Sequence, residues 1–331
     1  MSTTADETRD RLDFVDAMAG DAVEALSRLH EGVRQVVFTD FPDHHNIGDA
    51  AIALGQLAFW RRAGIEVVMT YSWRTIGDGV FGSAIPVAIQ GGGNVGGLYP
   101  VHGEHRFALA ERLDPATLLI QEPQTIHFVT DADRESFATR LASREAFRLA
   151  VRDRPSLDAV RDLMPSAILS PDSAHVLGRL AAPAPTRAAV FLLRRDGESA
   201  LHGDGLRPRT PHAVDWPELG FGDLARRRVA RIVREGQLRR TDNRRTSNWE
   251  RDARLRVERG VRLLSPGETI VTDRLHAMLL ALQMGRRVIA IDNANGKLTS
   301  YARTWFADGR APVVFAEDLA HAAELLRTGR P

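Results

Sequence analysis

Short apolar runs alternate with longer amphipathic segments along the first half of the chain. Strands buried on both faces of a parallel sheet are apolar throughout, whereas surface helices repeat their apolar positions every three to four residues. Strands are predicted at Val36–Thr39, Ile65–Thr70, Pro86–Gln90, Leu118–Gln121, Phe147–Val151 and Ala167–Leu169. Helices are predicted between them at Ala50–Ala63, Glu104–Arg112, Arg134–Leu141 and Ser156–Met164. This alternation is typical of a parallel sheet with helices on both faces.

The pattern resumes after Ala181–Thr186, where two prolines among small residues interrupt both periods and indicate a linker. Strands follow at Ala189–Leu193, Thr269–Thr272, Val288–Ile291 and Val313–Phe315. Helices follow at Phe221–Glu235, Asp273–Met284, Leu298–Phe306 and Ala316–Arg327. The sequence thus predicts an α/β protein with two Rossmann-like, doubly wound domains, residues 1–182 and 183–331, facing each other across a cleft. Ligands of such sheets bind beyond the carboxyl ends of the strands.

Composition narrows the class of protein. The 331 residues are 44% hydrophobic, which is enough for two cores, and their formal net charge is only +1. The balanced charge argues against a protein that coats nucleic acid. The absence of cysteine excludes disulfides, thiolate metal sites and cysteine nucleophiles.

No apolar stretch is long enough to span a bilayer, and the polar, acidic start lacks the apolar core of a secretory signal. A cytoplasmic protein is therefore expected. One segment, residues 221–262, holds 14 arginines against 6 acidic residues. Its middle, residues 239–248, has no apolar periodicity and is predicted to be a mobile loop. The segment either contacts anionic lipid at the inner face of the membrane, or an acceptor diphosphate, or is simply solvated.

Polar residues follow the first predicted strand. Asn46, Gly48 and Asp49 lie at the start of a helix, where free backbone N–H groups bind anions or a capping side chain. Asp49 is either the N-cap or a functional carboxylate. His44 and His45 are adjacent in sequence and are not expected to aim at one ion, so no metal site is predicted.

A glycine-rich segment, GGGNVGG at 91–97, follows the third strand. Gly91, Gly93 and Gly96 have the G-x-G-x-x-G spacing, but no helix begins at Gly96, so a nicotinamide cofactor is not expected. We interpret the segment as a loop whose backbone approaches a ligand or another loop closely. Further polar residues at the ends of the strands are Asn94, Gln124, His127, Arg152 and Asp153.

The second half contains a sharper cluster. Arg274 and His276 lie where a predicted strand ends and a helix begins. Lys297, the only lysine among 44 basic residues, follows the glycine turn after the next strand. Lysine and arginine on neighbouring strand ends would bind a phosphate together with a carboxylate. Alternatively, Arg274 and Lys297 are solvated caps and His276 is a hydrogen-bonded core group.

With these motifs in place, the chain resembles the polysaccharide pyruvyltransferases, and in particular their bacterial exopolysaccharide branch. The resemblance runs from about Val36 to Phe306 and rests on ordered blocks: HNIGDAAIALGQ, GGGNVGGLYP, EPQTIHF, RD, PD, LLRRD, TDRLHAMLLAL and IDNANGKL. Two departures are Thr125, where close relatives often have serine, and Ala294-Asn295, where they often have a serine and a tyrosine. The second departure removes an aromatic surface and leaves acceptor recognition open.

The resemblance implies a GT-B-like fold and transfer of a pyruvyl group from phosphoenolpyruvate to two hydroxyls of a sugar, with release of phosphate. No cofactor is implied beyond this donor substrate. The acceptor would be a saccharide of a cell-surface glycan or its lipid-diphosphate-linked precursor. The arginine and histidine important in the family map onto Arg274 and His276.

The residue types suit this chemistry. Phosphoenolpyruvate carries about three negative charges, and a partly dry cleft must supply several cations to hold it. The residues expected to bind it are Arg274, Lys297, Arg194, Arg195, Arg152, Asn295 and Gly296. Histidine suits the protonation of the methylene carbon, so His276 is the expected general acid, with Asp273 or Asp292 offsetting the nearby positive charge.

The first domain would then bind the acceptor. The residues expected there are Asn46, Gly48, Asp49, Asn94, Gln124 and His127, with Asp49 as base. Two other functions fit the same fold: a glycosyltransferase that uses a nucleotide sugar, and a sugar- or phosphate-binding protein without turnover. The oligomeric state is left open by the sequence.

Overall fold

The computed structural model describes residues 4–194, 214–216, 242–292, 296–307, 309 and 311–329. It is a mixed α/β structure in which both sheets are entirely parallel. The expected fold class is confirmed at this level. The division into two domains at residue 182 stays a prediction.

The larger sheet is built from the first half of the chain and has the strand order β2-β1-β3-β5-β6-β7, with β4 also paired to β5. Its strands are β1 (Gln35–Thr39), β2 (Glu66–Thr70), β3 (Val87–Ile89), β4 (Gly92–Val95), β5 (Leu119–Ile126), β6 (Phe147–Val151) and β7 (Ile168–Leu169). The six strands that the apolar runs predicted are all present, as β1, β2, β3, β5, β6 and β7. The additional strand, β4, forms within the glycine-rich segment.

Helices connect these strands, as parallel strands require. They are α2 (Ile47–Ala63), α3 (Pro100–Arg112), α4 (Asp131–Phe137) and α5 (Arg154–Val160), with short turns η1 (Asp78–Val80), η2 (Ala138–Ala142) and η3 (Ser173–Leu177). Twelve residues of α2 are buried, which fits its almost uniformly apolar sequence. Its start and end are set by Asn46, whose side chain accepts a hydrogen bond from Gly48, and by Gly64 in a left-handed conformation.

The smaller sheet has the order β11-β10-β9-β8. Its strands are β8 (Arg187–Leu192), β9 (Gly267–Thr272), β10 (Arg287–Ile291) and β11 (Val313–Ala316), and its helices are α8 (Leu275–Gln283), α9 (Lys297–Trp305) and α10 (Leu319–Thr328). The strands and these three helices follow the predicted pattern. The predicted helix at 221–235 lies outside the described residues.

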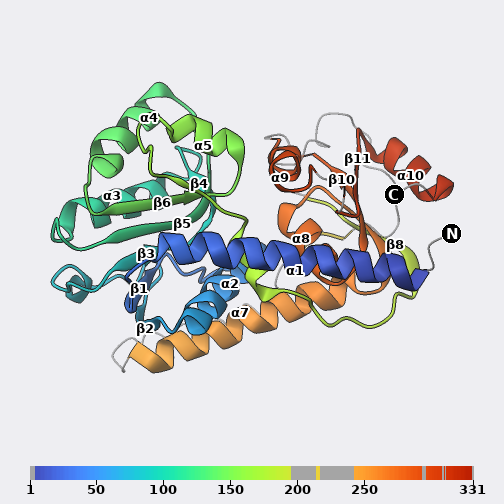
Figure 1. The fold of residues 1–331 in the computed structure, drawn as a ribbon, viewed down its shortest axis with the longest axis horizontal. Helices are drawn as coiled ribbons and strands as arrows, with labels where there is room; N and C mark the ends of the chain where they lie inside the picture. Colours follow the sequence, from blue (N-terminus) through green and yellow to red (C-terminus); the bar gives the residue numbers. More distant parts are fainter. Residues whose placement is uncertain are drawn as a thin grey trace.

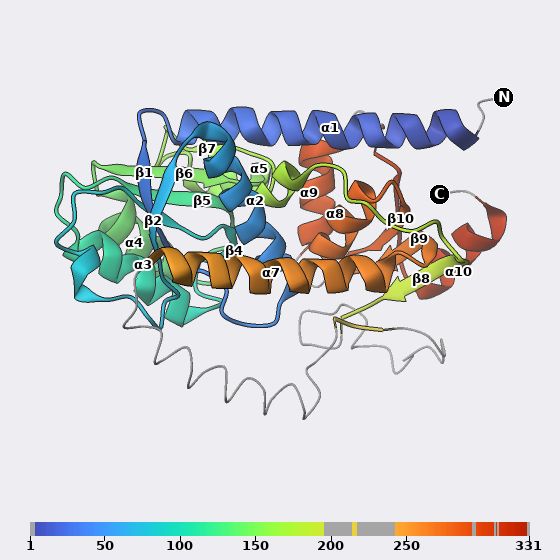
Figure 2. The ribbon, with the colours of Figure 1, turned by 90° about the horizontal axis from the view of Figure 1, so that it is seen from below.

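Two long helices, α1 (Thr4–Leu29) and α7 (Asp242–Leu264), run past both sheets (Figures 1 and 2). Buried residues of α1 and α7, such as Met18 and Val257, share one hydrophobic core with Leu54 of α2 and Met278 of α8. The core therefore continues from one sheet to the other. The sequence analysis did not predict α1.

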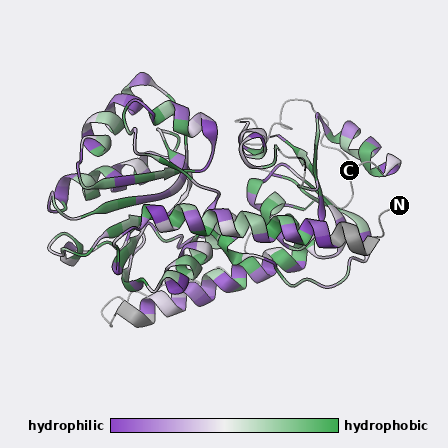
Figure 3. Cartoon of the chain, viewed as in Figure 1, coloured by the Kyte–Doolittle hydropathy of each residue, from purple (hydrophilic) through white to green (hydrophobic). Residues whose placement is uncertain are grey.

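The loop expected at 239–248 is wrong from Asp242 onward, because α7 begins there. Trp249, Ala253 and Val257 are buried and lie on one side of the helix at spacings of four residues, although 7 of the 23 residues of α7 are arginines. Figure 3 shows how hydrophilic the rest of α7 is. The narrow apolar stripe was hidden by the charged residues around it.

Candidate active site

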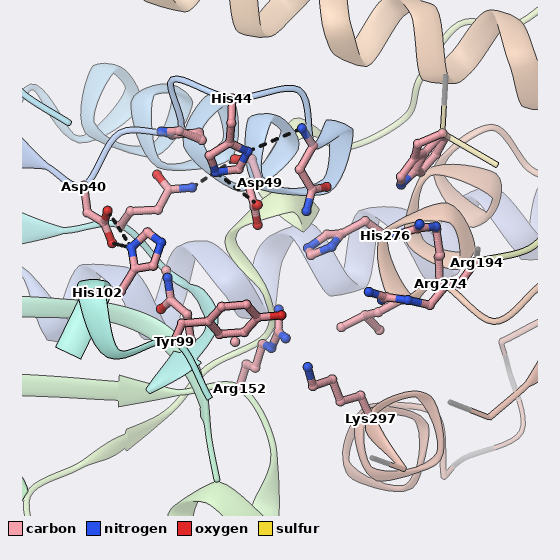
Figure 4. A pocket seen from close by; sticks show the side chains of 18 residues that line it. Asp40, His44, Asp49, Tyr99, His102, Arg152, Arg194, Arg274, His276 and Lys297 are labelled. Atoms are coloured by element: carbon pink, nitrogen blue, oxygen red, sulfur yellow. Dashed lines mark hydrogen bonds and ion pairs between the residues drawn. The ribbon is translucent and has the colours of Figure 1, made fainter. Parts of the chain in front are cut away.

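A cavity of about 290 Å³ is lined by residues that follow the strands of both sheets (Figure 4). The larger sheet and its helices contribute Asp40, Pro42, His44, Asn46, Asp49, Gln90, Gly91, Gly93, Asn94, Tyr99, His102 and Arg152. The second half contributes Arg194, Trp216, Arg274, Leu275, His276 and Lys297. The volume is at the lower end of the range for small-molecule sites. Residues predicted beyond the strand ends, among them Arg152, Arg274 and Lys297, thus line one cavity, and their function stays a prediction.

Positive charge gathers on one side of the cavity. Arg194 follows β8, Arg274 follows β9 and Lys297 opens α9 after β10. Arg152, which follows β6 of the larger sheet, extends toward them (Figure 4). Four side chains that the sequence assigned to an anionic donor therefore line one cavity, although they lie up to 145 positions apart.

Arg274 is held in place by Asp215. Its Nε and Nη2 atoms donate to the two carboxylate oxygens of Asp215 at 2.7 and 2.9 Å, and both side chains are nearly buried. A bidentate pair of this kind fixes the plane of the guanidinium group. Asp215 therefore orients Arg274.

His276 lies between two segments of the first half of the chain. Its Nε2 atom is 3.3 Å from Oδ2 of Asp172, which follows β7. On its other side is Gly48 in the first turn of α2, where a Cβ atom would come within 2.7 Å of the ring carbon Cγ. Only glycine at position 48 leaves room for the imidazole in this position.

Asp172 is a buried carboxylate between two cationic groups. The same Oδ2 atom also accepts a hydrogen bond from Nη1 of Arg152 at 2.7 Å. Burial raises the pKa of Asp172, but His276 and Arg152 outweigh burial and the net pKa is lowered well below the usual range. Asp172 is therefore ionised and places a negative charge directly beside the imidazole of His276.

The sequence analysis expected Asp273 or Asp292 in that role, whereas the carboxylate found in contact with the ring is that of Asp172. Asp273 accepts a hydrogen bond from the backbone N–H of Arg194, and Asp292 accepts one from the backbone N–H of Leu298. Both carboxylates position backbone at strand ends. The partner of His276 comes instead from the other sheet, which sequence spacing alone could not indicate.

Arg152 is almost completely buried among polar partners. Besides Asp172, it donates from Nε to Oγ1 of Thr125 at 2.7 Å, and Thr125 in turn donates to Asp153 at 2.8 Å. Gly93 leaves room for the guanidinium group, because a Cβ atom at position 93 would lie only 2.8 Å from Nη2 of Arg152. The hydroxyl that the sequence retains at Thr125 thus helps to orient Arg152.

The opposite side of the cavity is formed by the start of α2. The N-cap is Asn46, whose Oδ1 accepts from the backbone N–H of Gly48 at 2.9 Å, so the reading of Asp49 as N-cap is wrong. Asp49 lies in the first helical turn with its side chain 30% exposed, 3.6 Å from Nε2 of His44. Its carboxylate is accessible from the cavity.

Asn94 is fixed by an arginine buried behind it. Its Oδ1 atom accepts from Nη2 of Arg106 at 2.6 Å and from Nε2 of Gln124 at 3.0 Å. Gln124 itself is fully buried and does not line the cavity, and neither does the exposed His127. These two predicted acceptor residues therefore lie behind the cavity wall or outside it.

The glycine-rich segment behaves as predicted in one respect. A Cβ atom at Gly91 would lie 2.7 Å from the carbonyl oxygen of Pro123, and one at Gly96 would collide with the carbonyl of His127. The segment therefore approaches another stretch of backbone closely. Part of it is strand β4 rather than loop, because it pairs with the extended end of β5.

The remaining predicted residues have mixed outcomes. Gly48 contacts His276 rather than the cavity, and Gly296 is the left-handed N-cap residue that precedes Lys297. Arg195 and Asn295 lie outside the described residues. Within the described ranges, no group of three or more histidine and acidic side chains is arranged to hold a metal ion.

Several residues of this site were not predicted from sequence. They are Asp40, Gln90, Tyr99, His102, Asp172 and Trp216. Three of them carried a signal: Asp40 follows the first strand, Tyr99 belongs to the block GGGNVGGLYP and Asp172 to the short PD block. His102 carried none, since it lies on the first turns of α3 and becomes part of the site only through packing.

Comparison with known proteins adds an independent finding. The family described as "Polysaccharide pyruvyl transferase" matches residues 46–295. Pyruvyl transferase 1 of Schizosaccharomyces pombe is 28% identical over 314 residues, covering 87% of this chain and 75% of its own length. The Bacillus subtilis protein EpsO, which carries the name of a pyruvyl transferase, is 25% identical over 283 residues, covering 82% of this chain and 85% of its own.

A solved structure shares the fold. A Klebsiella pneumoniae protein described as uncharacterized superposes with a TM-score of 0.63 at 18% identity, covering 91% of this chain and 99% of that one. At this identity the similarity concerns the fold alone. In the part of the chain that the structure describes, every helix is too short or too polar to cross a bilayer.

Proposed function

Because the chain belongs to the polysaccharide pyruvyl transferase family and is a transferase, we propose that it moves a pyruvyl group from phosphoenolpyruvate onto two hydroxyls of a saccharide. The product would be a cyclic ketal together with inorganic phosphate. The observation that carries the proposal is the set of Arg152, Arg194, Arg274 and Lys297 around one cavity that also contains His276.

The donor would lie against these four cations. Phosphate and carboxylate groups are held best by fixed guanidinium groups and an ammonium in a site from which water is partly excluded. Arg274 is pre-oriented by Asp215 and Arg152 by Asp172 and Thr125, so neither side chain must be ordered when the anion binds.

In this proposal His276 performs the first chemical step, the protonation of the methylene carbon. Its support is the contact of Nε2 with the ionised carboxylate of Asp172 at 3.3 Å, which orients the imidazole beside the cations. Proton transfer gives an oxocarbenium-like carbon. The donor's own carboxylate and phosphate groups, held in place by the four cations, stabilise the positive charge on this carbon.

The acceptor would lie on the side of α2, where Asn46, Asp49 and Asn94 offer hydroxyl-binding groups. One hydroxyl adds to the oxocarbenium carbon. Phosphate then leaves with the electron pair of its carbon–oxygen bond, and the second hydroxyl closes the ring. The two hydroxyl protons balance the one delivered to the methylene carbon and the one that leaves with phosphate.

The proposal is tested by binding and by turnover. We expect phosphoenolpyruvate to raise the melting temperature and to give a calorimetric binding isotherm, while UDP- and GDP-sugars give neither. Phosphate release from phosphoenolpyruvate should then require a saccharide or saccharide–lipid fraction. Binding of nucleotide sugars without binding of phosphoenolpyruvate would favour the glycosyltransferase, and donor binding with no turnover on any acceptor would favour a binding protein.

The surface of α7 supports a second, weaker element of the proposal, contact with an anionic lipid surface at the inner face of the membrane. Its exposed face carries Arg251, Arg254, Arg259 and Arg262 beside the exposed Leu255, although Glu250 and Glu258 pair with two of them. Liposome flotation tests this. Equal recovery with neutral and anionic vesicles would contradict it.

A further inference from the structure

A second buried carboxylate–histidine pair lines the cavity opposite His276. His102 Nδ1 lies 2.9 and 3.0 Å from the two carboxylate oxygens of Asp40. The side chain of Asp40 is only 2% exposed, whereas that of His102 is 20% exposed and reaches the cavity. The pair joins the end of β1 to the first turns of α3.

The backbone at Asp40 is strained in a way that serves this contact. Its φ angle is +59°, and Asp40 is the single residue other than glycine with a positive φ among those the structure describes. Such a conformation is rare for a residue with a side chain, and it persists where the surroundings require it. Here it turns the chain directly after β1, and the carboxylate that follows accepts the hydrogen bond of His102 Nδ1.

The charges around the pair keep the carboxylate of Asp40 ionised. Burial raises the pKa of Asp40, but the hydrogen bond from His102 and the charge of Arg106 outweigh burial, so the net pKa is lowered. The ionised carboxylate accepts the hydrogen bond of Nδ1, so that Nε2 is the ring nitrogen left to contact a ligand. The positive charge next to Asp40 comes from Arg106, whose Nη2 atom lies 3.8 Å from Oδ2 of Asp40. The neighbouring His105 adds no charge at neutral pH, because burial lowers its pKa to about 4.

This ring nitrogen faces the place where the acceptor would lie. Among the described contacts, none engages Nε2 of His102, and Figure 4 shows the ring turned with Asp40 behind it and the cavity before it. The rings of Trp73 and Tyr99 flank it, each with its centroid 6.4 Å away. Asp49, the base suggested by the sequence, is a carboxylate that is 30% exposed to water.

The reaction needs an acid on the donor and a base on the acceptor. A proton acceptor is most effective when it titrates near the working pH, which is a property of imidazole rather than of an exposed carboxylate. Two of the three histidines that line the cavity are oriented by a buried carboxylate: Asp172 for His276 and Asp40 for His102. The third, His44, lies 3.6 Å from the partly exposed carboxylate of Asp49. The two buried pairs lie at opposite walls, one on the donor side and one on the acceptor side.

We infer that His102 is the catalytic base of the acceptor half-reaction and that Asp40 is its positioning residue. This inference rests on the proposed function. Nε2 of His102 takes the proton of the attacking saccharide hydroxyl while the hydroxyl oxygen forms its bond to the pyruvyl carbon. The proton then leaves with the departing phosphate, so that the ring is neutral again for the next turnover.

The test compares four variants of the full chain: His102→Gln, His102→Ala, Asp40→Asn and Asp49→Asn. Asparagine tolerates the left-handed backbone of position 40, so Asp40→Asn removes the charge without adding strain. His321→Gln on α10, outside the residues that line the cavity, is the matched control. Phosphate release is followed with phosphoenolpyruvate and the best acceptor from a panel of nitrophenyl glycosides, and donor affinity is measured by calorimetry.

We expect His102→Gln to lower kcat by about 10²-fold or more and Asp40→Asn by about 10-fold, with donor affinity within a factor of two of the unmodified protein. Added imidazole should restore part of the turnover of His102→Ala and none of Asp49→Asn. The inference is overturned if the kcat of His102→Gln lies within a factor of three of that of the unmodified protein. It is also overturned if the substitution changes only the KM for the saccharide. Failure of the unmodified protein to bind phosphoenolpyruvate would instead contradict the proposed function.

Discussion

The carboxylate of Asp172, which follows the last strand of the larger sheet, lies 3.3 Å from Nε2 of His276, which lies on a helix of the smaller sheet. The two residues are brought together because α2 and η3 pack against α8 in one continuous core. The proton chemistry of the site is thus built from both halves of the chain.

The first prediction concerns this contact. Asp172→Asn should lower kcat by about 10²-fold, because a neutral amide no longer places a negative charge against the ring of His276 and orients it less firmly. Phosphate release measures this change, and combining the substitution with His276→Ala should lower kcat little further. The backbone N–H of Ala174 can still donate to the asparagine oxygen, so the fold should persist. Fully additive losses in the double variant would show that Asp172 does not act through His276.

His276→Ala isolates the acid itself. Turnover should fall by about 10²-fold or more, while the dissociation constant for phosphoenolpyruvate stays near that of the unmodified protein, because the cations remain. The measurements are phosphate release and calorimetry. Activity that survives within a factor of a few would assign the proton transfer to another group.

Arg274→Ala should act on the donor instead. Loss of its charge is expected to weaken phosphoenolpyruvate binding by about 10- to 100-fold, and Asp215→Asn by less, since it only loosens the guanidinium plane. Arg303→Ala is a suitable control because this arginine is exposed on α9 and does not line the cavity. Equal affinities for all three variants would reject the donor-binding role.

Gly48→Ala tests the packing of the imidazole. The added Cβ would press on the ring of His276, so turnover should fall at least about 10-fold through displacement of the ring. Gly20→Ala is a matched control, because Gly20 also lies in a helix and a Cβ there meets open space. Both variants should keep the circular dichroism spectrum of the unmodified protein. Full activity of Gly48→Ala would mean that the ring can move without cost.

The last prediction concerns acid sensitivity. Burial lowers the pKa of His175 from 6.5 to about 4, so the folded protein prefers the neutral ring. Its contribution to stability is complete above pH 6.5 and is lost as the pH falls toward 4, at about 1.4 kcal/mol per pH unit. His175→Phe keeps a ring stacked on Tyr301 and removes the titration. The free energy of unfolding, measured with urea at pH 7, 6 and 5, should fall less steeply with decreasing pH for this variant than for the unmodified protein. The same pH dependence in both proteins would contradict the prediction.

The sequence by itself determined the strands, most helices and the strand-end location of the donor residues. Parallel strands buried on both faces leave continuous apolar runs, and side chains such as Arg274 and Lys297 follow those runs directly. These are local signals, so no knowledge of distant contacts is needed to read them. The ordered blocks from His45 onward likewise point to the family without any structure.

Only the tertiary structure decided which groups act together. His276 contacts Asp172 across 104 positions, and His102 is joined to Asp40 across 62 positions. Hydrogen bonds between distant segments depend on how helices pack over the sheets. One amino-acid sequence contains no periodic pattern from which that packing could be predicted. For the same reason α7 was hidden, since its buried stripe acquires meaning only against α2 and the core that both sheets share.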